Sequence, residues 1–110
     1  MLNAKHKEKT MNITTTNENG KVTLALDGWL DTLSAPELGR AVEAVTSASE
    51  LVLDLDAVDY MSSSGLRQIV ASHRKAKELE ATFSVVNVGT EVMSIFRLTG
   101  IDKKLNITAK

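Results

Sequence analysis

The sequence predicts an α/β fold in which helices cover a mixed, mostly parallel sheet, in the order β-β-α-β-α-β-α-β. Short apolar runs alternate three times with segments whose apolar residues recur at helical spacing. An Asn-Gly pair separates the first two strand-like runs, which is typical of an antiparallel hairpin. The chain has 110 residues, of which 43% are hydrophobic, and this suits one domain with a sizeable core.

The N-terminal part is predicted to hold a tail and then a hairpin. We interpret residues 1–11 as a flexible tail or an upstream extension, so that the domain spans residues 12–110. Strands are expected at residues 12–16 and 21–26, on either side of the Asn-Gly turn. The second strand alternates apolar residues with smaller or polar ones, the period of a strand with one buried face. Its apolar residues are Val22, Leu24 and Leu26.

The first helix is predicted to begin near Ser34. Ser34 and Glu37 have the spacing of a capping box, in which each side chain accepts a hydrogen bond from the other residue's backbone N–H. Pro36 falls in the first turn, where its missing N–H costs little. The polar stretch 46–49 ends the helix. Apolar residues recur between these points at Leu38, Val42 and Val45.

The remaining elements alternate strand and helix. Residues 51–55 form an apolar run without clean alternation, which suits a strand buried on both faces at the sheet centre. A helix is expected from about Ser63 to about Glu80. Another buried strand, a short helix and a final strand follow at residues 82–88, 91–98 and 105–108.

The run Ser62-Ser63-Ser64-Gly65 lies at the junction between the central strand and the helix after it. The first turn of a helix has free N–H groups and a partial positive charge, so it accommodates a serine cap, an anion or a phosphate. One serine would suffice as a cap, and three in succession followed by glycine exceed that need. The junction is therefore the candidate functional site.

Composition excludes several functions. The net charge of −1 offers no field that would gather nucleic acid, and the chain has no cysteine for a disulfide or a zinc site. Neither His6 nor His73 belongs to a cluster with metal-ligand spacing. No signal peptide and no run as long as a membrane span is present. We expect a cytoplasmic protein without cofactor or metal.

Hydrolysis by the serines is disfavoured, so we expect no enzyme. A nucleophilic Ser63 needs a neighbouring base, and Met61 stands where the nucleophile elbow has its first glycine. His73 lies ten residues further along the same helix, about 15 Å away at 1.5 Å per residue. Nucleotide-binding motifs are also missing, which leaves binding of a small ligand or nucleotide at this loop as a minor alternative.

A serine at a helix N-terminus could instead be the substrate of a kinase. Phosphate there gains from the helix dipole, so the fold need not change. It still adds about −1.5 to −2 charges to a small surface. A protein that docks on this surface would be repelled, which predicts a binding switch.

The chain resembles STAS domains of the anti-sigma-factor antagonist (anti-anti-sigma) family over about residues 12–108. The stretch 51–66, which reads LVLDLDAVDYMSSSGL, is the most specific part. LDGWLD from Leu26 with APEL from Ala35, and residues 86–101, add to the resemblance. Many members have aspartate where this chain has Ser62, and a small or acidic residue where it has Trp29.

The resemblance implies that Ser63 is the phosphoacceptor, with Ser62 and Ser64 as alternatives. It implies a GHKL-type serine kinase that is also the anti-sigma factor. The unphosphorylated protein would bind this kinase and free a sigma factor, and a PP2C-type phosphatase would reset the cycle. The docking surface would include Asp31, Thr32, Met61, Ser62, Ser64, Gly65 and Leu66.

Two alternatives stay open at this point. Stand-alone STAS domains also resemble accessory subunits of membrane transporters, which need no phosphate cycle and no insertion into the membrane. The small-ligand or nucleotide sensor is the other. A homodimer is compatible with each of these functions.

Overall fold

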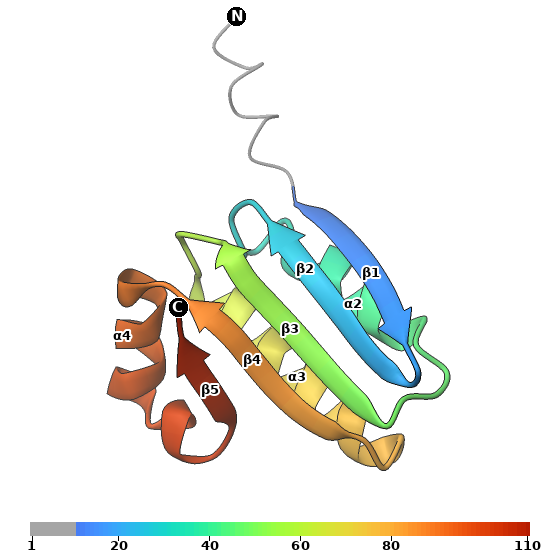
Figure 1. Ribbon diagram of the computed structural model, residues 1–110. Coiled ribbons are helices and arrows are strands. Elements are labelled where there is room, and N and C mark those ends of the chain that lie inside the picture. Colours follow the sequence, from blue (N-terminus) through green and yellow to red (C-terminus); the bar gives the residue numbers. More distant parts are fainter. Residues whose placement is uncertain (1–10) are drawn as a thin grey trace, which may run out of the picture.

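A computed structural model describes residues 11–110, and its elements follow the predicted order (Figure 1). The strands in this part of the chain are β1 (Asn12–Glu18), β2 (Lys21–Asp27), β3 (Glu50–Ala57), β4 (Thr82–Val88) and β5 (Asn106–Ala109). The helices are α2 (Ala35–Glu43), α3 (Ser63–Glu78) and α4 (Thr90–Thr99), and the short 3-10 turn η1 (Ile101–Lys103) precedes β5. The predicted N-terminal tail lies outside the described residues apart from Met11, whose side chain is buried in the core.

The sheet confirms the predicted mixed topology. Its strand order is the chain order, with β1 antiparallel to β2 and the other neighbours parallel. Parallel crossovers are right-handed, so successive crossovers in one direction place their helices on the same face. Figure 1 shows α2 and α3 together behind the sheet. We call the face that these helices do not cover the open face.

The register of the strands places the core between the sheet and the helices. Leu24 pairs with Leu53, and Leu53 pairs with Val85, and all three side chains are fully buried. Side chains alternate between the two faces of a strand, so the preceding residues face the other way. This second row, on the open face, consists of Thr23, Val52 and Ser84.

One rim of the sheet gathers the ends of several elements. The parallel strands β2, β3 and β4 all end there, and we call it the carboxyl rim (Figure 1). Strand β1 begins at this rim, where Asn12 pairs with Asp27. Lys110 also lies here, because its Nζ donates a hydrogen bond of 2.9 Å to the Asp56 carbonyl. Both ends of the described chain are therefore at the carboxyl rim.

The predicted capping box at the start of α2 is wrong. Ser34 precedes the helix but makes no side-chain capping bond. Its Oγ accepts a hydrogen bond from the Asp31 N–H at 2.9 Å and donates one to the Trp29 carbonyl at 2.5 Å. The hydroxyl thus stabilises the loop before the helix, and it is not available to the N–H of Glu37. Glu37 N–H donates to the Ser34 carbonyl instead.

Candidate functional site

Two loops at the carboxyl rim are joined side by side, one at residues 28–34 after β2 and one at residues 58–62 after β3. The Leu30 N–H donates to the Tyr60 carbonyl at 3.0 Å, and the Ser62 N–H donates to the Leu30 carbonyl at 2.9 Å. Leu30 and Met61 form a parallel bridge, and both side chains are buried. The pairing fixes the loop that precedes α3 against the loop that precedes α2.

Gly65 allows α3 to approach this pair of loops closely. A Cβ atom at Gly65 would lie 2.4 Å from the carbonyl oxygen of Leu30 and 2.8 Å from its Cγ. Both distances are far below van der Waals contact. Only glycine fits there without a shift of the backbone, so the glycine after the serines is required by packing.

The three serines have different environments. Ser62 is the N-cap of α3, and its Oγ accepts a hydrogen bond of 3.3 Å from the Gly65 N–H. Ser63 is the first residue of the helix and is exposed. Ser64 is half-buried, and its Oγ lies 3.2 Å from the Thr32 Oγ1, a hydrogen bond across the two loops. Ser63 is thus the exposed hydroxyl of the run, at the positive end of a 16-residue helix.

Asp31 maintains the shape of the first loop. Its Oδ1 accepts hydrogen bonds of 3.1 Å from the backbone N–H groups of Leu33 and Ser34. Side chains of Asp that accept from the backbone a few residues ahead are common in tight turns. These bonds hold Leu33 and Thr32 on the outside of the loop, where both are exposed.

The two joined loops expose three large apolar side chains, Trp29, Leu33 and Tyr60, which we call the apolar patch. The exposed fraction is 36% for Trp29, 85% for Leu33 and 48% for Tyr60. The rings of Trp29 and Tyr60 are in contact, with centroids 5.4 Å apart. Large apolar side chains that gather on an exposed surface are typical of protein interaction sites. Sequence reasoning noticed Trp29 alone, because the proximity of residues 29 and 60 depends on the pairing of the loops.

The structure brings the predicted partner-binding residues to one region, at different depths. Thr32 is exposed, whereas Asp31, Ser62, Ser64 and Leu66 are half-buried. Met61 and Gly65 are buried, so they support the surface from below. The region carries charges of both signs, because Lys110 pairs with Asp56 at 3.7 Å and Arg67 is exposed near the start of α3. Exposed carboxylates also flank the loops at the ends of β2 and β3. They belong to Asp27, Asp56 and Asp59.

His73 packs against the sheet. Its ring lies 5.4 Å from the ring of Phe83 on β4. In the sequence, His73 is ten residues after Ser63, in the second half of α3. Burial lowers the pKa of His73 below its usual 6.5, and the positive charge of Lys77 lowers the pKa further. Within residues 11–110 no group of side chains is arranged to hold a metal ion. No helix in the same part is both long and apolar enough to cross a membrane.

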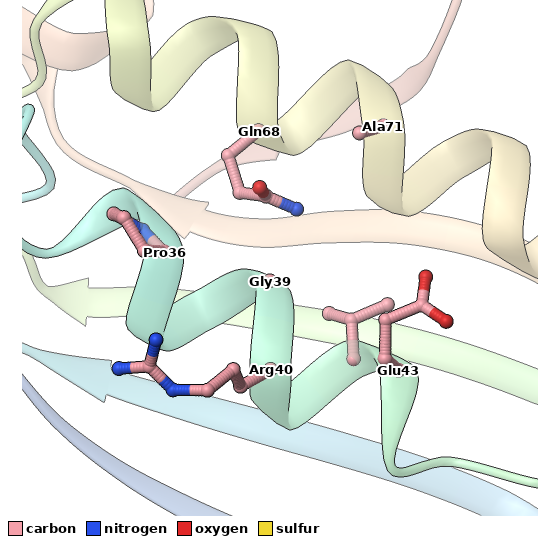
Figure 2. A pocket seen from close by; sticks show the side chains of 7 residues that line it. Pro36, Gly39, Arg40, Glu43, Gln68 and Ala71 are labelled. Carbon is pink, nitrogen blue, oxygen red and sulfur yellow. The ribbon is translucent and has the colours of Figure 1, made fainter.

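A groove of about 490 Å³ runs between α2 and α3 (Figure 2). In Figure 2, Gln68 of α3 reaches over Gly39 of α2, and Arg40 and Glu43 lie along the α2 side. Lys75 pairs with Glu43 at 3.5 Å. Ser62, Ser63 and Ser64 do not line this groove. It therefore offers no recess in which a small ligand would contact the serines.

Comparisons with known proteins agree with this geometry. The family model for the STAS domain matches residues 11–110. The anti-sigma-F factor antagonist RsfB of Mycobacterium tuberculosis is 30% identical over 97 residues, which cover 86% of this chain and 79% of RsfB. The crystal structure of an anti-sigma factor antagonist from Mycobacterium paratuberculosis superposes with a TM-score of 0.83. The two sequences are 29% identical, and the match covers 93% of this chain and 88% of the M. paratuberculosis chain.

A more distant neighbour is the Bacillus cell fate determinant SpoIIAA in its phosphorylated form. Its structure superposes with a TM-score of 0.69 at 13% identity, and the match covers 90% of this chain and 93% of SpoIIAA. At that identity the likeness concerns the fold.

Proposed function

This chain belongs to the STAS domain family, and from that premise we propose that it is an anti-sigma factor antagonist controlled by phosphorylation of Ser63. In its unphosphorylated form it binds a GHKL-type serine kinase that is also the anti-sigma factor, and a sigma factor is released. Phosphate on Ser63 ends this binding, and a PP2C-type phosphatase restores it. The protein acts by binding in the cytoplasm, without an enzymatic activity of its own.

The observation that carries the proposal is the position of Ser63. Its side chain is exposed on the first residue of α3, directly after the loop that exposes Tyr60 and is joined to the loop that exposes Trp29 and Leu33. A kinase can reach such a hydroxyl, and a docking partner can cover it. The names of RsfB and of the M. paratuberculosis protein support the antagonist role, and the phosphorylated form of SpoIIAA supports a phosphate in this fold.

The switch follows from electrostatics. Phosphoserine carries about −1.5 to −2 charges at neutral pH. The joined loops contain Asp31 and Asp59, and Arg67 is an exposed cation four residues after Ser63 on α3. A partner that covers this surface would remove water from the phosphate, which costs free energy. The helix dipole stabilises the phosphate in the free protein, so the fold is preserved while binding is lost.

The test compares the full chain with serine and with phosphoserine incorporated at position 63. Binding is measured by calorimetry against the purified GHKL-type ATPase encoded in the same genome. We expect binding by the serine form, and at least a tenfold loss, roughly 1.4 kcal/mol, for the phosphoserine form. Ser63→Ala should bind normally and accept no phosphate from the kinase. Phosphoserine at position 47, an exposed serine in the loop after α2, is the matched control because it adds the same charge elsewhere.

Other outcomes discriminate between functions. Equal binding by the serine and phosphoserine forms would contradict the switch at Ser63. Failure of both forms to bind the ATPase, combined with capture of a membrane transporter subunit, would favour the accessory-subunit function. Transfer of phosphate to Ser62 or Ser64 in the Ser63→Ala variant would reassign the phosphoacceptor.

A further inference from the structure

The two edges of the sheet differ in their protection. Strand β5 has four residues and a register shift against β4, and Lys103, Lys104 and Lys110 flank it. Short strands, irregular pairing and lysines are the usual means by which proteins prevent an edge from pairing with another chain. Strand β1 has seven residues in continuous register with β2, and it contains no lysine or proline. Of the two edges, β1 is thus the unprotected one.

The sequence of β1 favours pairing with another strand. It reads NITTTNE, with four β-branched residues in its centre and its single charge, Glu18, at one end. Its inner edge pairs with β2, and residues 11–110 supply no hydrogen bonds to its outer edge. Exposed edges of this kind accept an added strand through their main-chain N–H and C=O groups.

We propose that β1 pairs with β1 of a second copy of this chain, antiparallel and around a two-fold axis at Thr15. Residues that lie opposite each other on paired strands have their side chains on the same face of the sheet. In a continuous sheet, odd-numbered residues of one β1 must therefore lie opposite odd-numbered residues of the other. Residues 13, 15 and 17 lie on the helix side, because they pair with Leu26, Leu24 and Val22. Centring the pairing on Thr15 meets this condition and keeps all seven residues of β1 paired.

This register is chemically self-complementary. It places Thr14 opposite Thr16 and Thr15 opposite its own copy, and threonine pairs across strands stabilise sheets. Glu18 meets Asn12 of the second copy, so the two Glu18 carboxylates stay at opposite ends. The result would be a sheet that continues through both copies, with the helices of both on one side.

A groove beside β1 offers space for the second copy. It has a volume of about 380 Å³ and lies between β1 and the end of α2, lined by Thr15, Asn17, Ala41 and Val45 among others. In the proposed register, Ile13 of the second copy lies opposite Asn17, on the same helix side as the groove. Its side chain would therefore cover the half-buried Ala41 and the exposed Ala44, which both line the groove.

Single-cysteine variants of the full chain test the register, because the chain has no cysteine of its own. Thr15→Cys should form a disulfide-linked dimer under mild oxidation in the native state, since opposite Cβ atoms are about 5 Å apart. Thr108→Cys on β5 is the matched exposed control and should stay monomeric. Equal cross-linking of both variants would indicate random collision and overturn the proposal.

Charged substitutions at the two-fold axis give a second test, in which sedimentation equilibrium measures the dimer dissociation constant. Thr15→Lys and Thr15→Glu should each raise the dimer dissociation constant roughly tenfold or more, because like charges then face each other. An equal mixture of the two variants should recover the dimer. A chain that stays at the 11.9 kDa monomer mass at its highest soluble concentration, or a dimer that Thr15→Lys leaves unchanged, would overturn the proposal. Neither test depends on the phosphorylation of Ser63.

Discussion

Gly65 connects the serines to the apolar patch at the scale of single residues. Its missing Cβ lets the first turn of α3 rest on the backbone of Leu30, which in turn holds Tyr60 and Ser62 by hydrogen bonds. The obstacle to any side chain here is a carbonyl oxygen within a paired loop. Unlike the end of a flexible side chain, this oxygen cannot turn away.

Gly65→Ala is therefore expected to destabilise the fold. The free energy of unfolding should fall by about 1–3 kcal/mol, as for other overpacked sites, measured by urea denaturation. Gly39→Ala is the control, since it also adds a methyl group to a helix. Its nearest obstacle is the mobile Oε1 of Gln68 at 3.0 Å, and alanine is the better helix former by about 1 kcal/mol. Equal stability of the two variants would contradict the close approach at Leu30.

At the scale of elements, the start of α3 separates a structural serine from an accessible one. Ser62 accepts the Gly65 N–H, which would otherwise lack a partner in the helix. Ser63 is the first residue of the helix, and its side chain is exposed. Adjacent residues of one type thus have different roles, set by whether they precede or begin the helix.

Ser62→Ala should cost about 0.5–1 kcal/mol of unfolding free energy, the lower part of the range for lost N-caps, because its bond is long at 3.3 Å. Ser63→Ala should leave the stability nearly unchanged. Thermal unfolding followed by circular dichroism of both variants measures the difference. A larger loss for Ser63→Ala than for Ser62→Ala would show that the cap has been assigned to the wrong serine.

The predicted elements came from local patterns, and the structure departs from them where tertiary contacts compete. Alternation located β2, and helical spacing located α2, α3 and α4, because burial imposes those periods directly. The capping box failed since Asp31 and Trp29, both outside the local motif, use the Ser34 hydroxyl. The turn η1 gave no signal in a stretch too short for any period.

The candidate site was predictable only in part for the same reason. Ser63 could be placed because a strand followed by a helix fixes where the helix starts. Leu33 and Tyr60 escaped notice, since each is a single apolar residue in a polar loop. The contact of Tyr60 with Trp29 depends on the bridge between Leu30 and Met61, which joins segments about thirty residues apart.

At the scale of the whole molecule, His73 links stability to pH. Its folded-state pKa lies below 6.5, so the unfolded chain binds more protons than the folded chain between the two values. Stability from this residue is complete above pH 6.5 and is lost as pH falls through that window. His73→Gln should therefore flatten the dependence of unfolding free energy on pH between about 7.5 and 5.5.

The measurement uses urea denaturation at several pH values. His6 lies outside the described residues, so both chains should carry His6→Gln to remove its titration from the comparison. The slope should be smaller in the His73→Gln chain. An identical slope in the two chains would mean that His73 titrates alike in the folded and unfolded states.

The position of the chain ends at the carboxyl rim has a practical consequence. Met11 and Lys110 both leave the fold on the side that carries Ser63 and the apolar patch. An affinity tag or a fluorescent protein fused directly after Lys110 would stand next to this surface and could shield it from a partner. The opposite rim, with the turns at Asn19 and Glu80, offers an attachment point away from this surface for a dye or a linker to a solid support. Immobilised through that rim, the protein would present its candidate binding surface to the solution.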